Sequence, residues 1–121
     1  MIANRTDAQL KIYVEKENDV VIILLVGPVD AATFEYFKDE LDPLFKEGSP
    51  KIAVDCGSLT YINSKGIGLL ANYHRMLLIR KGNVVLFNVS RRLMKTLDLL
   101  GLAKRLNICA SKDEAFALLA E

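Results

Sequence analysis

The sequence has 121 residues, of which 51% are apolar, and this is enough for one compact domain with a single hydrophobic core. Charged residues make up 26% and the formal net charge is +1, which excludes the strong basic field that favours direct binding to nucleic acid or to a membrane surface. The longest apolar run, residues 20–26, is too short to span a bilayer, and residues 1–10 lack the apolar stretch of a signal peptide. We therefore expect a single cytoplasmic domain over residues 1–121.

The first predicted elements form a hairpin. Apolar and polar residues alternate over residues 10–14, which indicates an edge strand, and residues 15–19 make a charged turn. The apolar run over residues 20–26 then predicts a buried strand. Gly27-Pro28 should stop that strand.

A helix and a third strand are predicted next. Asp30 is a candidate cap for the helix, and Pro43 should kink or end it. The apolar positions of this helix fall at helical spacing: Phe34, Phe37, Leu41 and Leu44. Residues 51–55 predict a short strand, and residues 56–63 predict a loop.

A long helix is predicted after this loop. One apolar stripe runs along it, formed by Ile67, Leu70, Ala71, Leu77 and Leu78, and Lys81-Gly82 should close it. Residues 84–87 predict another buried strand. Ser90 is then expected to cap a helix that Gly101 ends.

The last predicted elements are a short strand over residues 106–108 and a helix that opens with a capping box at residues 111–114. From residue 20 onward, strands and helices alternate, which is typical of parallel strands joined by helical crossovers. The predicted fold class is therefore α/β: a mixed, mostly parallel sheet of about five strands, with an antiparallel hairpin at its N-terminal edge and about four helices.

The stretch 55–70 runs from a strand end to a helix start, which is where open α/β sheets carry their functional sites. Ser64 falls where the helix begins, so its hydroxyl either caps backbone N–H groups or projects from the helix tip. Gly66 and Gly68 follow within one turn, although each is disfavoured in a helix by about 1 kcal/mol relative to alanine. Either the glycines permit tight helix-to-sheet packing beside an ordinary capping serine, or they leave room for a partner beside a regulated one.

Phosphorylation of Ser64 would add roughly −1.5 to −2 charges at the positive end of a helix dipole, which the fold should tolerate. A partner surface that fits a neutral serine would instead meet a bulky hydrated dianion. Modification at this position should therefore act on binding rather than on folding.

The segment Asn63-Ser64-Lys65-Gly66-Ile67-Gly68, preceded by Leu-Thr-Tyr-Ile, resembles the signature loop of the STAS family, especially its single-domain anti-sigma factor antagonists. Residues 27–30, Gly-Pro-Val-Asp, are similar to the Gly-x-x-Asp at the end of the family's second strand. Residues 54–55, 82–89 and 93–102 resemble further core elements of the family. The resemblance covers nearly the whole chain and implies the STAS fold.

In this family, the unphosphorylated antagonist binds an anti-sigma factor serine kinase and thereby frees a sigma factor, while a separate serine phosphatase reverses phosphorylation. The resemblance implies that Ser64 is the phosphoryl acceptor. It also implies that a partner-binding surface surrounds it, formed by Asp30, Asn63, Ser64, Lys65, Gly66 and Gly68. We accordingly expect a regulator of transcription that is not an enzyme and needs no cofactor or metal. The alternative is a scaffold or transporter-associated subunit of the same fold that is never phosphorylated.

Two positions depart from the family pattern. Asn63 stands where aspartate is usual, and it keeps the shape of aspartate but loses the charge that could orient a kinase-bound metal. Lys65 stands where a small residue is usual. Its cation would favour a phosphate on Ser64 or contact an acidic partner, or it is simply a solvated side chain. Asp30 is likewise either part of the binding surface or only a helix cap.

Nucleophilic catalysis by Ser64 would need a nearby base, and His74 is the sole histidine. Ten residues of helix separate the two by about 15 Å, so we expect His74 to be a half-buried structural residue and not a metal ligand. Cys56 and Cys109 lie in or beside predicted strands and are expected to be free, packed thiols.

Two surface features leave alternatives open. Leu69, Tyr73 and Met76 widen the apolar surface of the long helix, either for a partner or for neighbouring helices. Arg91-Arg92 at a helix N-terminus is unfavourable for the helix dipole, which indicates an acidic contact unless these side chains are merely solvated.

Overall fold

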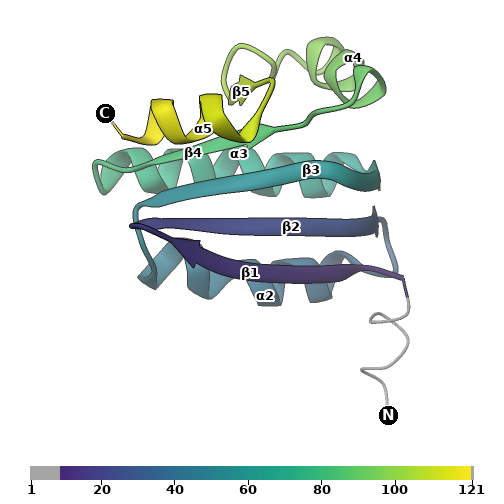
Figure 1. Ribbon diagram of the computed structural model, residues 1–121. Helices are drawn as coiled ribbons and strands as arrows, with labels where there is room; N and C mark the ends of the chain where they lie inside the picture. Colours follow the sequence, from purple (N-terminus) through teal and green to yellow (C-terminus); the bar gives the residue numbers. More distant parts are fainter. Residues whose placement is uncertain (1–8, 121) are drawn as a thin grey trace.

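The computed structural model describes residues 9–120. Residues 1–8 and 121 lie outside this part. Both ends of the predicted domain, and most of the segment considered for a signal peptide, therefore lie outside the described residues. The elements are β1 (Lys11–Glu17), β2 (Val20–Val29), α2 (Phe34–Glu47), β3 (Lys51–Ile62), α3 (Ser64–Ile79), β4 (Asn83–Phe87), α4 (Arg91–Leu99), β5 (Asn107–Cys109) and α5 (Lys112–Leu119). They form one sheet in the order β1-β2-β3-β4-β5, with β1 antiparallel and the rest parallel (Figure 1). The predicted fold class is confirmed.

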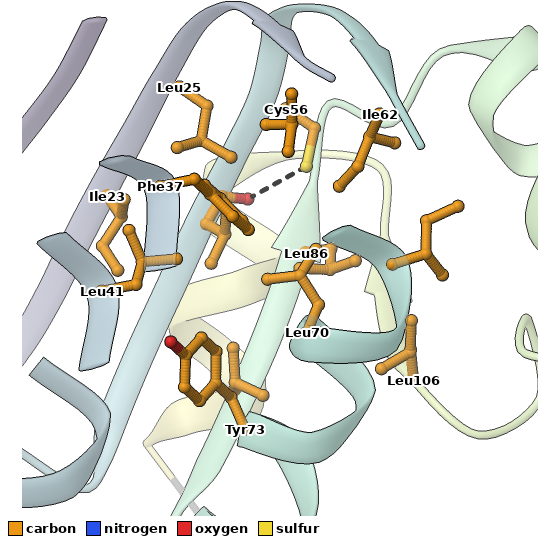
Figure 2. Close-up of a cluster of buried hydrophobic side chains, with 14 of the residues drawn as sticks. Ile23, Leu25, Phe37, Leu41, Cys56, Ile62, Leu70, Tyr73, Leu86 and Leu106 are labelled. Carbon is orange, nitrogen blue, oxygen red and sulfur yellow. Dashed lines mark hydrogen bonds between the residues drawn. The ribbon is translucent and has the colours of Figure 1, made fainter. Parts of the chain in front are cut away.

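Helices cover both faces of the sheet (Figure 1). Consecutive residues of β2 point to opposite faces of the sheet. Ile23 belongs to the core beneath α2 and α3, whereas Ile22 belongs to a smaller cluster with Leu119 of α5. In the larger cluster, Phe37 of α2 and Leu70 of α3 lie among the strand side chains (Figure 2). Within residues 9–120, none of the helices has the length and apolar character required to cross a bilayer.

Both cysteines are free thiols, as predicted. Cys56 lies in the core, where its Sγ is 3.8 Å from the carbonyl oxygen of Val54 (Figure 2). Burial raises the pKa of the Cys56 thiol to about 12 and also raises the pKa of the half-buried Cys109. Both side chains therefore stay neutral and pack as small apolar groups.

The residues that widen the apolar surface of α3 are packed within the fold, whereas Leu78 of the predicted stripe and Ile79 after it are exposed. Tyr73 is 1% exposed and its ring stacks on Phe45 of α2, with the ring centroids 4.1 Å apart. Leu69 and Met76 are partly buried against the same core. Of the two alternatives left open for these residues, packing within the fold is therefore the one that the structure supports.

The Tyr73 hydroxyl donates a hydrogen bond to Asp42 Oδ1, and Lys38 lies 2.8 Å from Asp42 Oδ2. The bond to Lys38 and then the bond to Tyr73 hold the pKa of the Asp42 carboxyl below its usual range. Because this pKa is lowered on folding, the stabilisation is present above the unfolded-state value and is lost as the pH falls through the folded-state value.

We expect Tyr73→Phe to lower the free energy of unfolding by about 1–2 kcal/mol at neutral pH, since a hydrogen bond to a carboxylate is lost. Because the pKa of folded Asp42 is lowered, the difference between variant and wild type should persist near the ordinary carboxyl value of about 4 and shrink only as the pH falls through the lowered value. Urea unfolding at neutral pH and at about pH 2 measures this. If the difference in the free energy of unfolding does not change with pH, the Tyr73 hydroxyl acts on ring packing and not through its bond to Asp42.

The hairpin differs from its prediction in length. β1 continues to Glu17 and the turn is only Asn18-Asp19, with Asn18 at a φ of 59°. Such a two-residue turn suits the twist of antiparallel strands, so the charged residues before it remain in the strand. The predicted turn over residues 15–19 is therefore too long.

Gly27-Pro28 does not stop β2, and the prediction that it does is wrong. The strand continues to Val29 through shifts in its register with β3. Gly27 absorbs the irregularity with a φ of 108°, and a Cβ there would lie 2.1 Å from the carbonyl oxygen of Gln9. Only glycine combines this conformation with so close a contact.

The third strand was also predicted too short. β3 runs to Ile62, so the predicted loop over residues 56–63 is nearly all strand. Its second half contains Gly57 and Ser58, which are weak strand formers, but it pairs with the equally extended end of β2. Partner-strand pairing therefore overrides local propensity here.

Pro43 does not end α2, which continues to Glu47. The ring lies on an exposed face, where water can satisfy the carbonyl group that loses its helical N–H partner. The helix begins later than the predicted cap Asp30: Thr33 is at the N-cap position but makes no side-chain cap bond, and Asp30 instead caps the turn that precedes α2.

The ends of the later elements match their predictions more closely. Ser90 and Ser111 cap α4 and α5, and Gly101 ends the α4 segment with a φ of 73°. At the end of α3 the positive φ falls on Lys81, whereas Gly82 is required because a Cβ would lie 2.3 Å from the carbonyl oxygen of Pro50. β5 begins one residue later than predicted.

Candidate docking site at the tip of helix α3

The parallel ends of β2 and β3 bring the predicted site residues to one edge of the sheet. Val29 pairs with Ile62, and the Asn63 N–H donates to the Val29 carbonyl oxygen at 2.9 Å. Asp30 and Ser64 follow directly on these neighbouring strands. Two segments more than thirty residues apart in sequence thus converge where α3 begins.

Asn63, not Ser64, caps α3. The Asn63 side chain accepts a hydrogen bond from the Gly66 N–H at 2.9 Å, and its backbone is extended while its carbonyl accepts from the Ile67 N–H at 3.0 Å. An aspartate would make the same bond, so the uncharged amide preserves the cap. Of the two roles left open for Ser64, capping is therefore excluded.

Ser64 is the first residue of α3, and its side chain is exposed. Among residues 9–120 it has no hydrogen-bond partner for its hydroxyl. The hydroxyl therefore projects from the helix tip into solvent, at the positive end of a 16-residue helix.

The two glycines have different roles. Gly66 is buried, and a Cβ there would lie 2.8 Å from Ile62 Cγ1 and 2.9 Å from Val29 Cγ1. The close approach that Gly66 permits is therefore between α3 and the strand ends, which is the packing alternative of the two left open for the glycines. Gly68 is exposed, and a Cβ there would have no atom within 4 Å. Gly68 lies one turn beyond Ser64 and continues the same face of the helix.

Lys65 is exposed, but its ammonium group points toward α2. Its Nζ lies 4.5 Å from the centroid of the Phe34 ring, in the geometry of a cation–π contact. This contact joins the first turns of α2 and α3. None of the three roles considered for Lys65 included this contact.

Asp30 shapes the turn between β2 and α2. Its Oδ1 accepts hydrogen bonds from the Ala32 N–H at 3.0 Å and from the Thr33 N–H at 3.1 Å. The Thr33 hydroxyl donates to the Pro28 carbonyl oxygen at 2.8 Å and accepts from the Asp30 N–H. Asp30 therefore holds a turn beside the α3 tip, and it remains half-buried at the surface there.

A groove opens next to Ser64. Its walls come from the end of β3, the first turns of α3 and the exposed side of α4, and it has a volume of about 490 Å³. Apolar side chains line much of it: Leu59, Ile62, Ile67, Leu93 and Leu100. Arg92 is the one charged side chain among the described residues that line it.

The α4 wall of this groove is what sequence reasoning missed. Arg91-Arg92 at a helix start was a signal, but nothing in the sequence says that α4 faces the tip of α3. Arg92 lines the groove with Ser64, whereas Arg91 lines a different hollow together with Met94 and Glu114.

The geometry of His74 excludes a dyad with Ser64. The two residues are ten positions apart on one straight helix, about 15 Å along its axis. His74 is half-buried with an unpartnered Nδ1, and burial lowers its pKa, so the imidazole is neutral at pH 7. Within residues 9–120, no three His, Cys, Asp or Glu side chains are grouped so that they could hold a metal ion.

Comparison with protein families finds that the STAS domain model matches residues 11–115. Among curated proteins, the anti-sigma-B factor antagonist of Listeria monocytogenes is 27% identical over 94 residues, which cover 78% of this chain and 82% of that protein. The anti-sigma-B factor antagonist of Bacillus subtilis is 25% identical over 99 residues, which cover 82% of this chain and 89% of that protein.

Solved structures share the fold. An anti-sigma factor antagonist from Mycobacterium paratuberculosis superposes with a TM-score of 0.85 at 17% identity, covering 93% of this chain and 96% of that one. SpoIIAA of Bacillus in its phosphorylated form gives 0.67 at 24% identity, with coverages of 89% and 98%. A murine Slc26a9 anion transporter gives 0.71 at 17% identity, where 88% of this chain matches 18% of the transporter.

Proposed function

Because the chain belongs to the STAS domain family, we propose that it is an anti-sigma factor antagonist that binds its partner through the tip of α3 and is released by phosphorylation of Ser64. In its unphosphorylated form it binds an anti-sigma factor serine kinase and frees a sigma factor. The kinase then modifies Ser64, and a serine phosphatase restores the binding form. The chain acts by reversible binding in the cytoplasm, and the two partner proteins supply the chemistry.

The observation that carries this proposal is the free hydroxyl of Ser64. Asn63 caps α3, so the fold places no demand on the Ser64 side chain. A phosphate at this first helical position would lie beside the positive end of the helix dipole and would not displace any hydrogen bond within residues 9–120. The domain can therefore keep its structure while its surface gains a dianion.

The proposed docking surface consists of Ser64 and Gly68 on one face of α3, with Asp30 and Lys65 beside them. Asn63 positions Ser64 through its cap, and Gly66 contributes from beneath by holding α3 close to the strand ends. At Gly68 a partner can approach the backbone of α3 closely, because no side chain intervenes. A bulky charge at Ser64 would block this approach one helical turn away.

The test is phosphorylation of the purified protein by candidate anti-sigma factor kinases with ATP, followed by intact-mass measurement. Wild type should gain the mass of one phosphoryl group, and Ser64→Ala should gain none. Ser58→Ala is the matched control, because Ser58 is another exposed serine, on β3, and its replacement should not affect the gain.

A gain that persists in Ser64→Ala would place the acceptor elsewhere. If no kinase modifies wild type and the chain instead purifies within a large membrane or sensory assembly, the scaffold alternative replaces this proposal. The shared fold with a segment of the Slc26a9 transporter is the observation that favours that alternative.

A further inference from the structure

We propose that phosphorylated Ser64 pairs with the Arg92 guanidinium across the groove between α3 and α4, so that the phosphate bridges the two helices and closes the groove. This inference rests on the proposed function, because it requires a phosphate on Ser64. It adds a second residue to the switch, on an element that the sequence did not connect with the site.

The groove itself places the two groups together. Ser64 stands on the α3 wall and Arg92 on the α4 wall, and both line the same hollow. Much of the lining between them is apolar, contributed by Ile62, Ile67 and Leu93. An ion pair over an apolar surface is less screened by water than one on an open surface, so the attraction across this groove is strengthened.

Arg92 is available for such a pair. Among residues 9–120, its guanidinium has neither an ion-pair partner nor a hydrogen-bond partner. Its backbone is fixed, because the Ser90 side chain caps α4 by accepting from the Leu93 N–H at 3.0 Å. Arg92 also gains nothing from the dipole of α4, which disfavours a cation in the first turn. A planar guanidinium binds two phosphate oxygens at once, which lysine cannot do.

The other nearby cations are directed elsewhere. Lys65 is adjacent to Ser64 in sequence, but its Nζ lies 4.5 Å from the Phe34 ring centroid, on the α2 side. Arg91 precedes Arg92 but lines a different hollow, with Glu114. Arg92 is therefore the counter-ion that the geometry selects, rather than Lys65, for which this role was one of the alternatives left open.

The pair would give the switch a change of shape as well as of charge. Unphosphorylated protein presents an open groove with an apolar lining and a free arginine beside the proposed docking face. Once the phosphate engages Arg92, that lining is covered and the arginine is no longer free to meet an acidic group of a partner.

The experiment uses the full chain with phosphoserine incorporated at position 64 during translation, so that no kinase is needed. Phosphorus NMR then follows the second ionisation of the phosphate against pH in the otherwise wild-type protein, Arg92→Gln and Arg91→Gln. Arg92→Gln should raise the phosphate pKa by about 0.5–1 unit, because the cation that favours the dianion is lost. Arg91→Gln removes the same charge from outside the groove and should leave the value within about 0.2 unit of the parent.

A second readout is the Arg92 side-chain N–H signal, which should shift with the phosphate titration in the phosphorylated protein and stay constant in the unphosphorylated one. Equal pKa values in Arg92→Gln and the parent, or a rise only in Lys65→Gln, would overturn the pair. Both arginines are exposed, so neither variant is expected to unfold, and amide spectra verify this. Because the phosphate is installed without a kinase, this result is separate from the kinase test: the proposed function can fail while the pair forms, and the pair can be absent from a protein that is switched.

Discussion

Ser64→Glu is expected to weaken binding to the anti-sigma factor by about 100-fold or more, which corresponds to about 3 kcal/mol. The cause is a carboxylate at the centre of the proposed docking face, which a partner fitted to a hydroxyl would have to bury without a counter-charge. The free energy of unfolding should change by no more than about 0.5 kcal/mol, because Ser64 is exposed and an acidic residue is favourable in a first helical turn. Isothermal titration calorimetry and urea unfolding measure the two quantities.

Two variants serve as controls for this prediction. Ser64→Ala removes the hydroxyl without adding charge and should keep the affinity within a few-fold of wild type. Ser58→Glu adds the same charge to an exposed position on β3 and should also bind. Full affinity in Ser64→Glu would move the docking surface away from the α3 tip, and a large loss of stability would mean that Ser64 supports the fold instead.

Local sequence rules were sufficient for much of the chain because the relevant interactions span only a few residues. Ser90 and Ser111 could be identified as caps since each accepts from an N–H three positions later. Gly101 could be placed at a helix end for the same reason. The parallel sheet followed from the alternation of apolar runs with helical patterns, and the position of Ser64 at the start of α3 followed from its place between them.

The errors arise where distant segments meet. The second half of β3 is strand only because β2 continues beside it, and neither half-strand has a strong pattern of its own. The sequence left open whether a partner or a neighbouring helix covers Tyr73, and the residues that cover it, Phe45 and Asp42, lie about thirty positions away. Spacing along a helix defines a face, but it does not identify the neighbour that covers it.

The same limit divides the candidate site. Ser64, Asn63 and the two glycines are adjacent in sequence, so the site could be located from the chain alone. Whether Ser64 caps α3 was left open, and the structure gives the cap to Asn63. Arg92 reaches the groove through the packing of α4, which local sequence patterns do not describe. The sequence thus indicated that Arg92 is a cation without a partner, and only the fold shows that it lines the same groove as Ser64.

The two glycines of α3 are expected to respond to the same substitution with opposite signs. Gly66→Ala places a methyl group within 3 Å of Ile62 Cγ1 and Val29 Cγ1, atoms near the backbone that cannot move away easily. Overpacking of this kind costs about 1–3 kcal/mol and outweighs the gain of about 1 kcal/mol in helix propensity, and Gly66→Val should cost more. Gly68→Ala meets no atom within 4 Å and should keep that gain, so its free energy of unfolding rises by up to about 1 kcal/mol.

Urea unfolding of both alanine variants, paired with their affinity for the anti-sigma factor, separates packing from docking. Gly66→Ala should lose stability. Gly68→Ala should lose affinity despite its greater stability, and Gly68→Arg should lose nearly all of its affinity. A Gly68→Arg variant that binds like wild type would remove Gly68 from the docking surface. A Gly66→Ala variant as stable as wild type would show that the side chains at the strand ends can move aside. Close packing of α3 on the strands would then not explain the glycine at position 66.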